Sequence, residues 1–199
     1  MRIYFARHGD KIRGGHYNPQ LRHQDEPLTE EGLTKARALG EYFAAREISA
    51  VYASMYLRAG QTAQCVADRK GLEVLRDERL NEIDNGILDS MTDEEIAEMF
   101  PAFWTDFHAH EADVRFPEGE TGEEVKARQA SFLDHLIQDG RDALAVCHEG
   151  YIRLLACHVL GMPVYMRHLF RVDMCAVLEL EYKDGTGIWK LIRMNQAVV

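Results

Sequence analysis

Short apolar runs alternate with longer amphipathic segments along most of this chain. The runs at residues 3–6, 50–53 and 143–147 are followed by polar residues or glycine, which is typical of strands that are buried on both faces. A weaker run lies at residues 72–75. Between the runs, apolar residues recur three and four positions apart, as they do on one face of a helix. The pattern predicts an α/β fold, a three-layer α/β/α sandwich with a mainly parallel central sheet.

Several of the predicted helices begin at recognisable caps. Thr29 precedes a helical pattern and two glutamates, and its hydroxyl suits the N-cap position. Thr92 with Glu95, and Thr121 with Glu124, have the spacing of capping boxes. Two further helices are expected from periodicity, at about residues 57–68 and 151–160.

The end of the chain has a different pattern. Residues 174–182 and 187–194 are strand-like and are separated by Asp184 and Gly185, a turn-forming pair. We therefore expect an antiparallel hairpin at one edge of the sheet. No internal repeat or change in composition divides the sequence, so we expect a single domain over residues 1–199.

Composition and charge limit the partners that the protein can have. The sequence is 46% hydrophobic and 28% charged, as in a globular domain with a sizeable core. Its formal net charge of −10 argues against nucleic acid, because a phosphate backbone needs a basic face. A small anionic substrate is still compatible with this charge, since a few arginines can bind one phosphate inside an acidic protein.

The expected location follows from what the sequence lacks. No stretch approaches the roughly 20 apolar residues of a membrane span, and no secretory leader is recognisable at the start. The four cysteines form no C-x-x-C pair, which favours free thiols in a reducing compartment. We expect a cytoplasmic protein without a membrane partner.

Chemically useful residues stand where predicted strands end. Arg7 and His8 follow the first strand, and His148 follows the strand at residues 143–147. The strand at residues 50–53 leads into a helix whose first turn carries Arg58. The carboxyl ends of parallel strands meet at one edge of a sheet. Two imidazoles and two guanidinium groups are therefore expected to converge.

This group suits a phosphate ester. Arg7 and Arg58 can hold phosphoryl oxygens with forked hydrogen bonds, one neutral imidazole can attack phosphorus, and the other can stabilise the transferring group. Phosphoryl transfer depends mainly on positioning and electrostatics, so the set requires no metal or cofactor. A proton donor for the departing oxygen is also needed. Glu82 and Glu120, in nearby loops, are the acidic candidates.

Each of these residues has an ordinary structural explanation when it is taken alone. A histidine at the end of an apolar strand is most simply a hydrogen-bonded structural residue. Arg58 alone would be a solvated helix residue, and Glu82 alone a surface carboxylate or a cap. Only their joint placement at the ends of elements favours a catalytic site.

Five blocks of sequence, in order, match a known family pattern. The first is Arg7-His8-Gly9. The others cover residues 54–63, 80–86, 117–121 and 147–153, the last with the second histidine, and residues 27–32 match the segment that opens the first helix in that family. With these motifs the chain resembles the histidine phosphatase superfamily, also called the phosphoglycerate mutase-like family, and most closely its phosphatase branch. The resemblance covers most of the chain.

The resemblance implies specific roles. His8 would be the nucleophile that forms a phosphohistidine. Arg7, Arg58 and His148 would form the phosphate pocket, and Glu82 would be the general acid and then the base toward water. Glu120 matches an acidic residue of structural type and is left out of the catalytic set.

The position after the second histidine departs from the family pattern. Glu149 stands where the family often has glycine. We expect its backbone N–H, at the start of a helix, to face the phosphate. Its carboxylate would repel a second anionic group on the substrate, so the departure affects the substrate more than the reaction.

The sequence therefore predicts a phosphomonoesterase that acts on a small phosphorylated metabolite through a phosphohistidine. The alternatives are phosphoryl transfer of the phosphoglycerate mutase type, and a non-catalytic phosphate-binding regulatory module. Neither the natural substrate nor the oligomeric state follows from the sequence.

Overall fold

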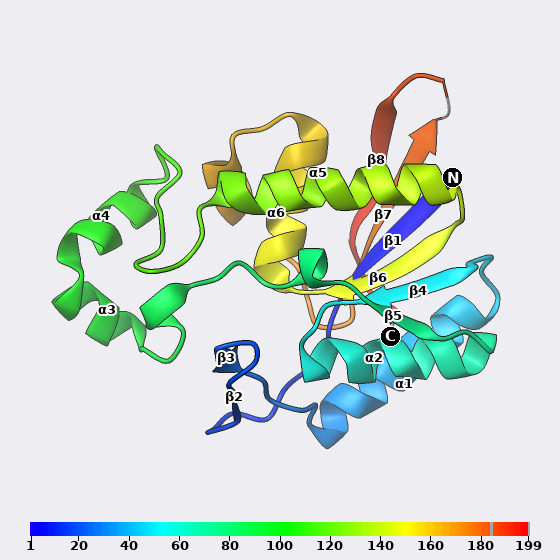
Figure 1. Ribbon diagram of the computed structural model, residues 1–199, viewed down its shortest axis with the longest axis horizontal. Coiled ribbons are helices and arrows are strands. Elements are labelled where there is room, and N and C mark those ends of the chain that lie inside the picture. Colours follow the sequence, from blue (N-terminus) through cyan, green and yellow to red (C-terminus); the bar gives the residue numbers. More distant parts are fainter. Residues whose placement is uncertain (184, 199) are drawn as a thin grey trace.

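The computed structural model describes residues 1–183 and 185–198 (Figure 1). The strands are β1 (Arg2–Arg7), β2 (Tyr17–Asn18), β3 (His23–Gln24), β4 (Ala50–Ala53), β5 (Val74–Arg76), β6 (Ala143–Cys147), β7 (Val177–Lys183) and β8 (Ile188–Gln196). The α-helices are α1 (Glu30–Ala44), α2 (Leu57–Lys70), α3 (Asp93–Met99), α4 (Pro101–Ala109), α5 (Gly122–Asp139) and α6 (Glu149–Leu160). Short 3-10 helices are η1 (Glu78–Leu80), η2 (Gly86–Leu88) and η3 (Val164–Leu169).

Six strands form the central sheet, in the order β5-β4-β6-β1-β7-β8. The first four in this order are parallel, whereas β7 runs antiparallel to both β1 and β8. The predicted α/β class and the antiparallel edge hairpin are thus confirmed. The turn predicted at Asp184 lies outside the described residues.

Alternate side chains of each strand serve the two faces of the sheet. Ile3 and Phe5 belong to the hydrophobic cluster that includes α5 and α6, whereas Tyr4 and Ala6 belong to the cluster that includes α1 and α2. Figure 1 shows α5 and α6 above the sheet and α1 and α2 below it. A strand buried on both faces needs apolar residues at every position, which explains the continuous run at residues 3–6.

The helix termini follow the predicted caps. The side chain of Thr29 accepts a hydrogen bond from the N–H of Gly32, and both predicted capping boxes are present, at the start of α3 and of α5. Helix α6 begins at Glu149, two residues before the predicted start, because His148 is its N-cap. Helix α2 continues to Lys70, where Gly71 in the left-handed conformation ends it.

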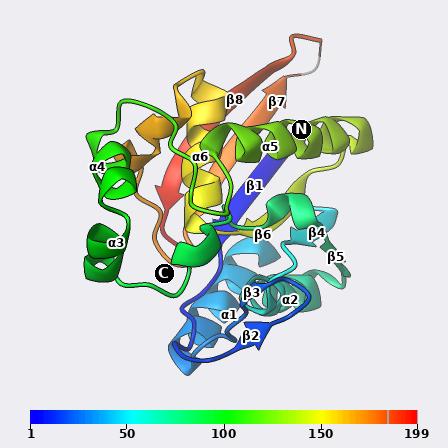
Figure 2. The same ribbon diagram turned by 60° about the vertical axis from the view of Figure 1, so that its left-hand side comes forward.

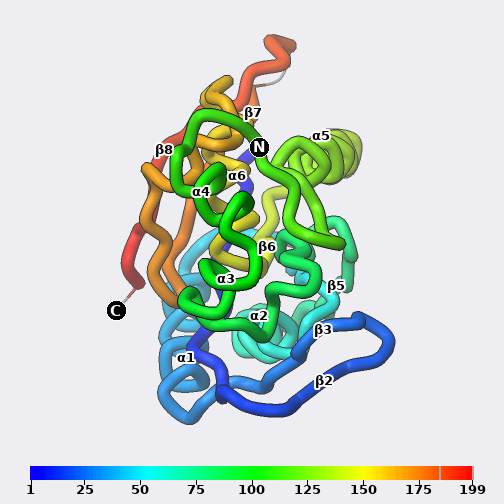
Figure 3. Tube along the Cα trace, turned by 90° about the vertical axis from the view of Figure 1, so that its left-hand side faces the viewer, coloured from blue at the N-terminus to red at the C-terminus, as the bar shows by residue number. Residues whose placement is uncertain are grey.

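Two segments extend from the sandwich beyond the end of the sheet at which β1 ends. Helices α3 and α4 stand on the left of Figure 1, and the loop with the β2–β3 hairpin lies below them. Figure 3, viewed from that side, shows α3 and α4 in front of the sheet. No helix among the described residues is long and apolar enough to cross a membrane.

Candidate active site

His8 lies directly after β1, where the chain leaves the sheet. It is 5% exposed, and its backbone N–H donates to the carbonyl of Cys147 on β6 (3.0 Å). Its Nδ1 lies 2.7 Å from the carbonyl oxygen of Gly9, and its Nε2 accepts from the Nε–H of Arg58 (3.2 Å). A carbonyl can only accept, so Nδ1 carries the proton and Nε2 carries the lone pair.

Burial lowers the pKa of His8 well below its ordinary value, and the charge of Arg58 lowers it further. The imidazole is therefore neutral near pH 7. A neutral imidazole with a fixed proton on Nδ1 presents one nucleophilic nitrogen. The sequence placed this residue correctly at the end of the first strand.

His148 lies beside His8, at the end of β6. It is fully buried, and the centroids of the two rings are 5.1 Å apart. The Nδ1 of His148 faces a terminal nitrogen of Arg58 at 3.5 Å, and its Nε2 lies 2.7 Å from Oγ of Ser54. Burial and the charge of Arg58 also lower the pKa of His148 well below its ordinary value.

Arg58 connects the two imidazoles. It occupies the first turn of α2, is 6% exposed, and its guanidinium carbon lies 4.3 Å from the centre of the Tyr56 ring. One of its terminal nitrogens donates to Oε2 of Glu26 (3.4 Å). Since His8 and His148 face the same guanidinium group, the predicted convergence of these three side chains is present.

A further buried carboxylate, that of Glu26, was not predicted from the sequence. It is 5% exposed and accepts from Nζ of Lys11 at 2.9 and 3.0 Å, in addition to its contact with Arg58. Burial, the largest single effect, raises the pKa of Glu26, but the hydrogen bonds and charge of Lys11, a backbone hydrogen bond and the charge of Arg58 together keep the pKa below its ordinary value. A single glutamate in a long loop has no periodicity or spacing that would have identified it.

Arg7 approaches from the other side of the site. Its side chain donates to the carbonyl of Val172 (2.7 Å) and forms an ion pair with Glu149 (2.7 Å), while its Nε is buried without a partner among the described residues. Glu149 also pairs with Arg153, one turn later on α6. The carboxylate of Glu149 is thus shared between two arginines.

Glu82 is held at the start of α6. Its carboxylate accepts from the backbone N–H groups of Tyr151 (2.8 Å) and Gly150 (3.1 Å). Residues 80–86 reach this helix because Arg128 of α5 donates to the carbonyl of Glu82 (3.1 Å) and pairs with Glu120 (3.1 Å). Glu120 therefore stabilises the loop at residues 80–86 through Arg128.

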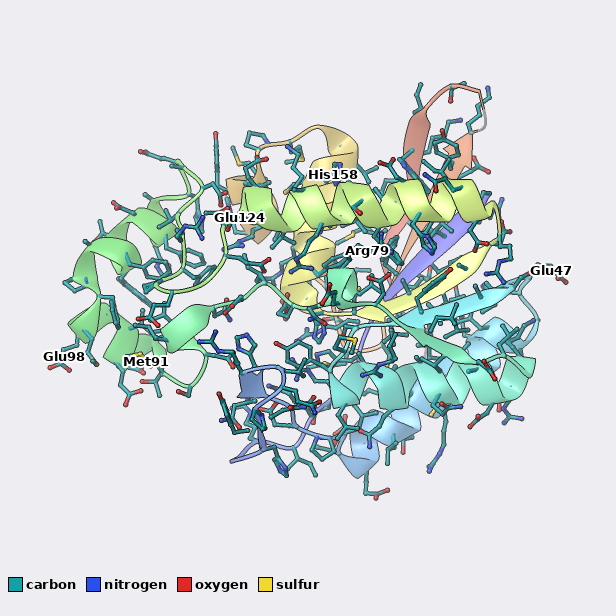
Figure 4. The ribbon with its side chains drawn as sticks, viewed as in Figure 1. Glu47, Arg79, Met91, Glu98, Glu124 and His158 are labelled. Carbon is teal, nitrogen blue, oxygen red and sulfur yellow. The ribbon has the colours of Figure 1, made fainter. Side chains whose placement is uncertain are left out.

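A cleft of about 390 Å³ opens beside Glu82. Its lining includes Tyr56 and Asp84, together with His23 from the β2–β3 hairpin. Arg79, labelled in Figure 4, lies below α5 and lines the same cleft. The imidazole of His23 lies 3.5 Å from Asp84 and 3.6 Å from Asp89. The β2–β3 hairpin therefore contacts the segment that follows Glu82.

Gly9 keeps the chain after His8 close to α1. A Cβ on Gly9 would lie 2.6 Å from the carbonyl oxygen of Gly32, and one on Gly32 would lie 2.1 Å from that of Asp10. The N–H of Gly9 donates to Oγ1 of Thr62 on α2 (3.0 Å). Both glycines are needed for this close approach of two backbones.

The site combines the unprotonated Nε2 of His8, the guanidinium groups of Arg7 and Arg58, and the neutral imidazole of His148. Positive charge beside a neutral nucleophile suits a doubly charged phosphoryl group. The carboxylate of Glu82 lines the cleft beside this group of residues.

Comparison with known proteins agrees with this chemistry. The model of the histidine phosphatase superfamily (branch 1) matches residues 3–197. A protein named as a probable phosphoglycerate mutase GpmB, from Enterobacter sp. (strain 638), is 33% identical over 197 residues, which cover 93% of this chain and 86% of that protein.

Solved structures show the same fold. A mycobacterial glucosyl-3-phosphoglycerate phosphatase in complex with inorganic phosphate has a TM-score of 0.85 and 25% identity, covering 100% of this chain and 99% of that chain. The alpha-ribazole phosphatase from Shigella flexneri has a TM-score of 0.82 and 23% identity, covering 99% and 97%, and so shows the fold alone. The predicted enzyme class, a histidine-type phosphatase, is supported by the family model and by the glucosyl-3-phosphoglycerate phosphatase. The chain belongs to the histidine phosphatase superfamily, branch 1.

Proposed function

We propose that this protein is a phosphomonoesterase that hydrolyses a small phosphorylated metabolite through a phosphohistidine on His8. The observation that carries the proposal is the unprotonated Nε2 of His8, in a buried, neutral ring that packs beside His148 and accepts a hydrogen bond from Arg58. A general base is not required to activate this nitrogen, because its lone pair is already available.

In the first step, Nε2 of His8 attacks phosphorus and the bond from phosphorus to the ester oxygen breaks. Glu82, in its protonated form, gives its proton to the departing oxygen. Arg7 and Arg58 stabilise the charge on the remaining phosphoryl oxygens, while His148 packs beside the ring of His8.

In the second step, the Glu82 carboxylate takes a proton from water as the water oxygen attacks phosphorus. The bond from phosphorus to Nε2 breaks, and phosphate and the neutral imidazole are restored. Each atom and proton is accounted for, and no cofactor takes part. The N–H groups of Gly150 and Tyr151 hold the carboxylate in place for both steps.

The test is hydrolysis of p-nitrophenyl phosphate by the wild type and by His8→Ala. We expect turnover in the wild type, an acid-labile phosphoprotein after rapid quenching, and neither in the variant. His16→Ala, an exposed histidine in the loop that follows, is the matched control and should keep full activity. A wild-type protein with no His8-dependent hydrolysis would instead support a non-catalytic phosphate-binding module.

A mutase is the second candidate, because relatives at 33% identity and below are named as probable phosphoglycerate mutases. A mutase would return the phosphoryl group from His8 to another hydroxyl instead of to water. Incubation with 3-phosphoglycerate separates the two reactions. Release of free phosphate supports the phosphatase, whereas isomerisation without free phosphate would overturn it.

A further inference from the structure

Arg167, on η3, is a cation without a counter-ion. Its guanidinium carbon lies 5.3 Å from the centre of the Phe107 ring and 5.4 Å from that of Phe116. One of its terminal nitrogens is buried without a hydrogen-bond partner, and over residues 1–183 and 185–198 no carboxylate lies within ion-pair distance of it. In Figure 2 the orange segment that contains η3 runs beside α4, which carries Phe107.

A charge in this position is costly to keep. Removing a guanidinium from water without an acceptor carries a large desolvation penalty, and contact with aromatic faces offsets only part of it. Burial accordingly lowers the pKa of Arg167 below its ordinary value. An unpaired, partly buried arginine that the proposed reaction does not use therefore points to an anion.

Arg153 presents a second nitrogen of this kind in the same place. Its Nε is buried without a partner among the described residues, while its other end pairs with Glu149. Arg153 and Arg167 line one cavity of about 120 Å³, together with Tyr165. A space of this size accommodates a carboxylate or a phosphate group.

The lining also includes two histidines and one acidic residue, whose charge acts on Arg167 from beyond ion-pair distance. His110 and His168 stack there with ring centroids 3.7 Å apart. Asp113 is the acidic residue of the lining, and its two oxygens accept from the N–H groups of Gly122 and Glu123 at 2.9 Å each. Asp113 thus binds the N–H groups at the start of α5. The guanidinium groups of Arg153 and Arg167 line the cavity.

The cavity adjoins the candidate active site through Glu149. The carboxylate of this residue contacts Arg7 on one side and Arg153 on the other. Glu149 thus links Arg7 of the phosphate pocket to Arg153 of the cavity through two ion pairs.

We propose that Arg153 and Arg167 form a second anion site, which holds a carboxylate or second phosphate on the departing part of the substrate. This inference rests on the proposed phosphatase function and narrows its substrates to esters with two anionic groups.

The test compares esters that differ by one anionic group: 3-phosphoglycerate with glycerol 3-phosphate, and fructose 1,6-bisphosphate with fructose 1-phosphate. The quantity measured is the ratio of kcat/KM within each pair, for the wild type, Arg167→Met and Arg153→Met. We expect the wild type to favour the doubly anionic member of at least one pair. Each variant should reduce this ratio on the order of ten- to hundredfold, mainly through KM, since one charge-assisted hydrogen bond is lost.

Arg171→Met is the matched control, because Arg171 is exposed and pairs with Asp173 only two residues away. It should leave both ratios unchanged. Arg167→Lys keeps the charge and should restore part of the ratio, and thermal melts should show that all variants are folded. A ratio near one in the wild type, or unchanged in both arginine variants, would overturn the proposal.

Two further outcomes distinguish a free anion from an anionic group of the substrate, and failure of the anion site from failure of the phosphatase function. If inorganic sulfate alters p-nitrophenyl phosphate hydrolysis in the wild type but not in Arg167→Met, while the ratios do not change, the site takes a free anion and the substrate assignment is overturned. If the wild type hydrolyses no ester, the proposed function fails. Calorimetric titration with sulfate then tests the anion site by itself. The site is supported if Arg167→Met binds one sulfate fewer than the wild type, and is overturned if both bind the same number.

Discussion

Oγ of Ser54 lies 2.7 Å from Nε2 of His148, and both residues are fully buried. Because Arg58 faces Nδ1 of the same ring, Nε2 carries the proton and donates it to the serine oxygen. The hydroxyl at the end of β4 thus fixes the tautomer and the orientation of an imidazole at the end of β6.

Ser54→Ala should therefore destabilise the protein and impair the reaction. The variant leaves a buried N–H without an acceptor, which costs about 1–3 kcal/mol in the free energy of unfolding. We expect kcat for p-nitrophenyl phosphate to fall as the ring loses its orientation. Urea denaturation and steady-state kinetics measure the two effects. Ser49→Ala, at an exposed serine before the same strand, should change neither quantity.

Glu26→Gln should weaken the anchoring of Arg58. The substitution keeps the shape of the side chain but removes the charge that Lys11 and Arg58 share. We expect KM for phosphate esters to rise several-fold and the free energy of unfolding to fall by about 1–3 kcal/mol. Glu30→Gln, in the exposed first turn of α1, provides the control. Unchanged kinetics in Glu26→Gln would show that Arg58 needs no anchor.

Glu82→Gln tests the proton donor. An alkyl phosphate leaves as a strongly basic alkoxide, whereas p-nitrophenolate departs readily without a proton. The variant should therefore slow hydrolysis of glycerol 3-phosphate far more than hydrolysis of p-nitrophenyl phosphate. Glu78→Gln, which lines the same cleft without touching α6, should affect the two substrates equally. The same slowing of both substrates in Glu82→Gln would remove Glu82 from the role of acid.

The two buried imidazoles should make stability depend on pH. Their pKa values in the folded protein lie well below the ordinary value of about 6.5. As pH falls below about 6.5, the unfolded chain takes up protons that the folded protein does not. Stability is therefore lost on acidification, by up to about 1.4 kcal/mol per pH unit for each imidazole.

Denaturation of the wild type between pH 7.5 and pH 5 measures this slope. The double variant His8→Gln, His148→Gln should show a flatter slope, whereas His16→Gln should keep the slope of the wild type. A wild-type stability that does not change over this range would contradict neutral, buried imidazoles.

Much of the fold could be predicted from local sequence. The continuous apolar runs and the capping threonines predicted the bounds of most strands and helices to within two residues. Burial of a strand on both faces and capping of a helix each leave a pattern in neighbouring residues. The order of the strands could not be predicted in this way. Pairing of Ile3 with Ala143 is a contact between distant segments, and no local pattern encodes it.

The site was predictable where its residues stand at the ends of elements. His8, Arg58 and His148 meet because three strand ends share one edge of the sheet. Glu26 and Arg167 were not predictable, since one lies in a loop and the other in a short 3-10 helix, and the positions of both depend on tertiary packing. The ion pair of Glu149 with Arg7 was not predictable either, because the two residues are far apart in the sequence.

The position of β1 has a consequence for the synthesis of this protein. The strand that carries the proposed nucleophile is made first, yet its partners in the sheet, β6 and β7, are made last. A growing chain therefore exposes an apolar strand until residue 143 and beyond have left the ribosome. Sheet closure and assembly of the histidine pair then coincide, so the appearance of phosphatase activity would report completion of the whole fold.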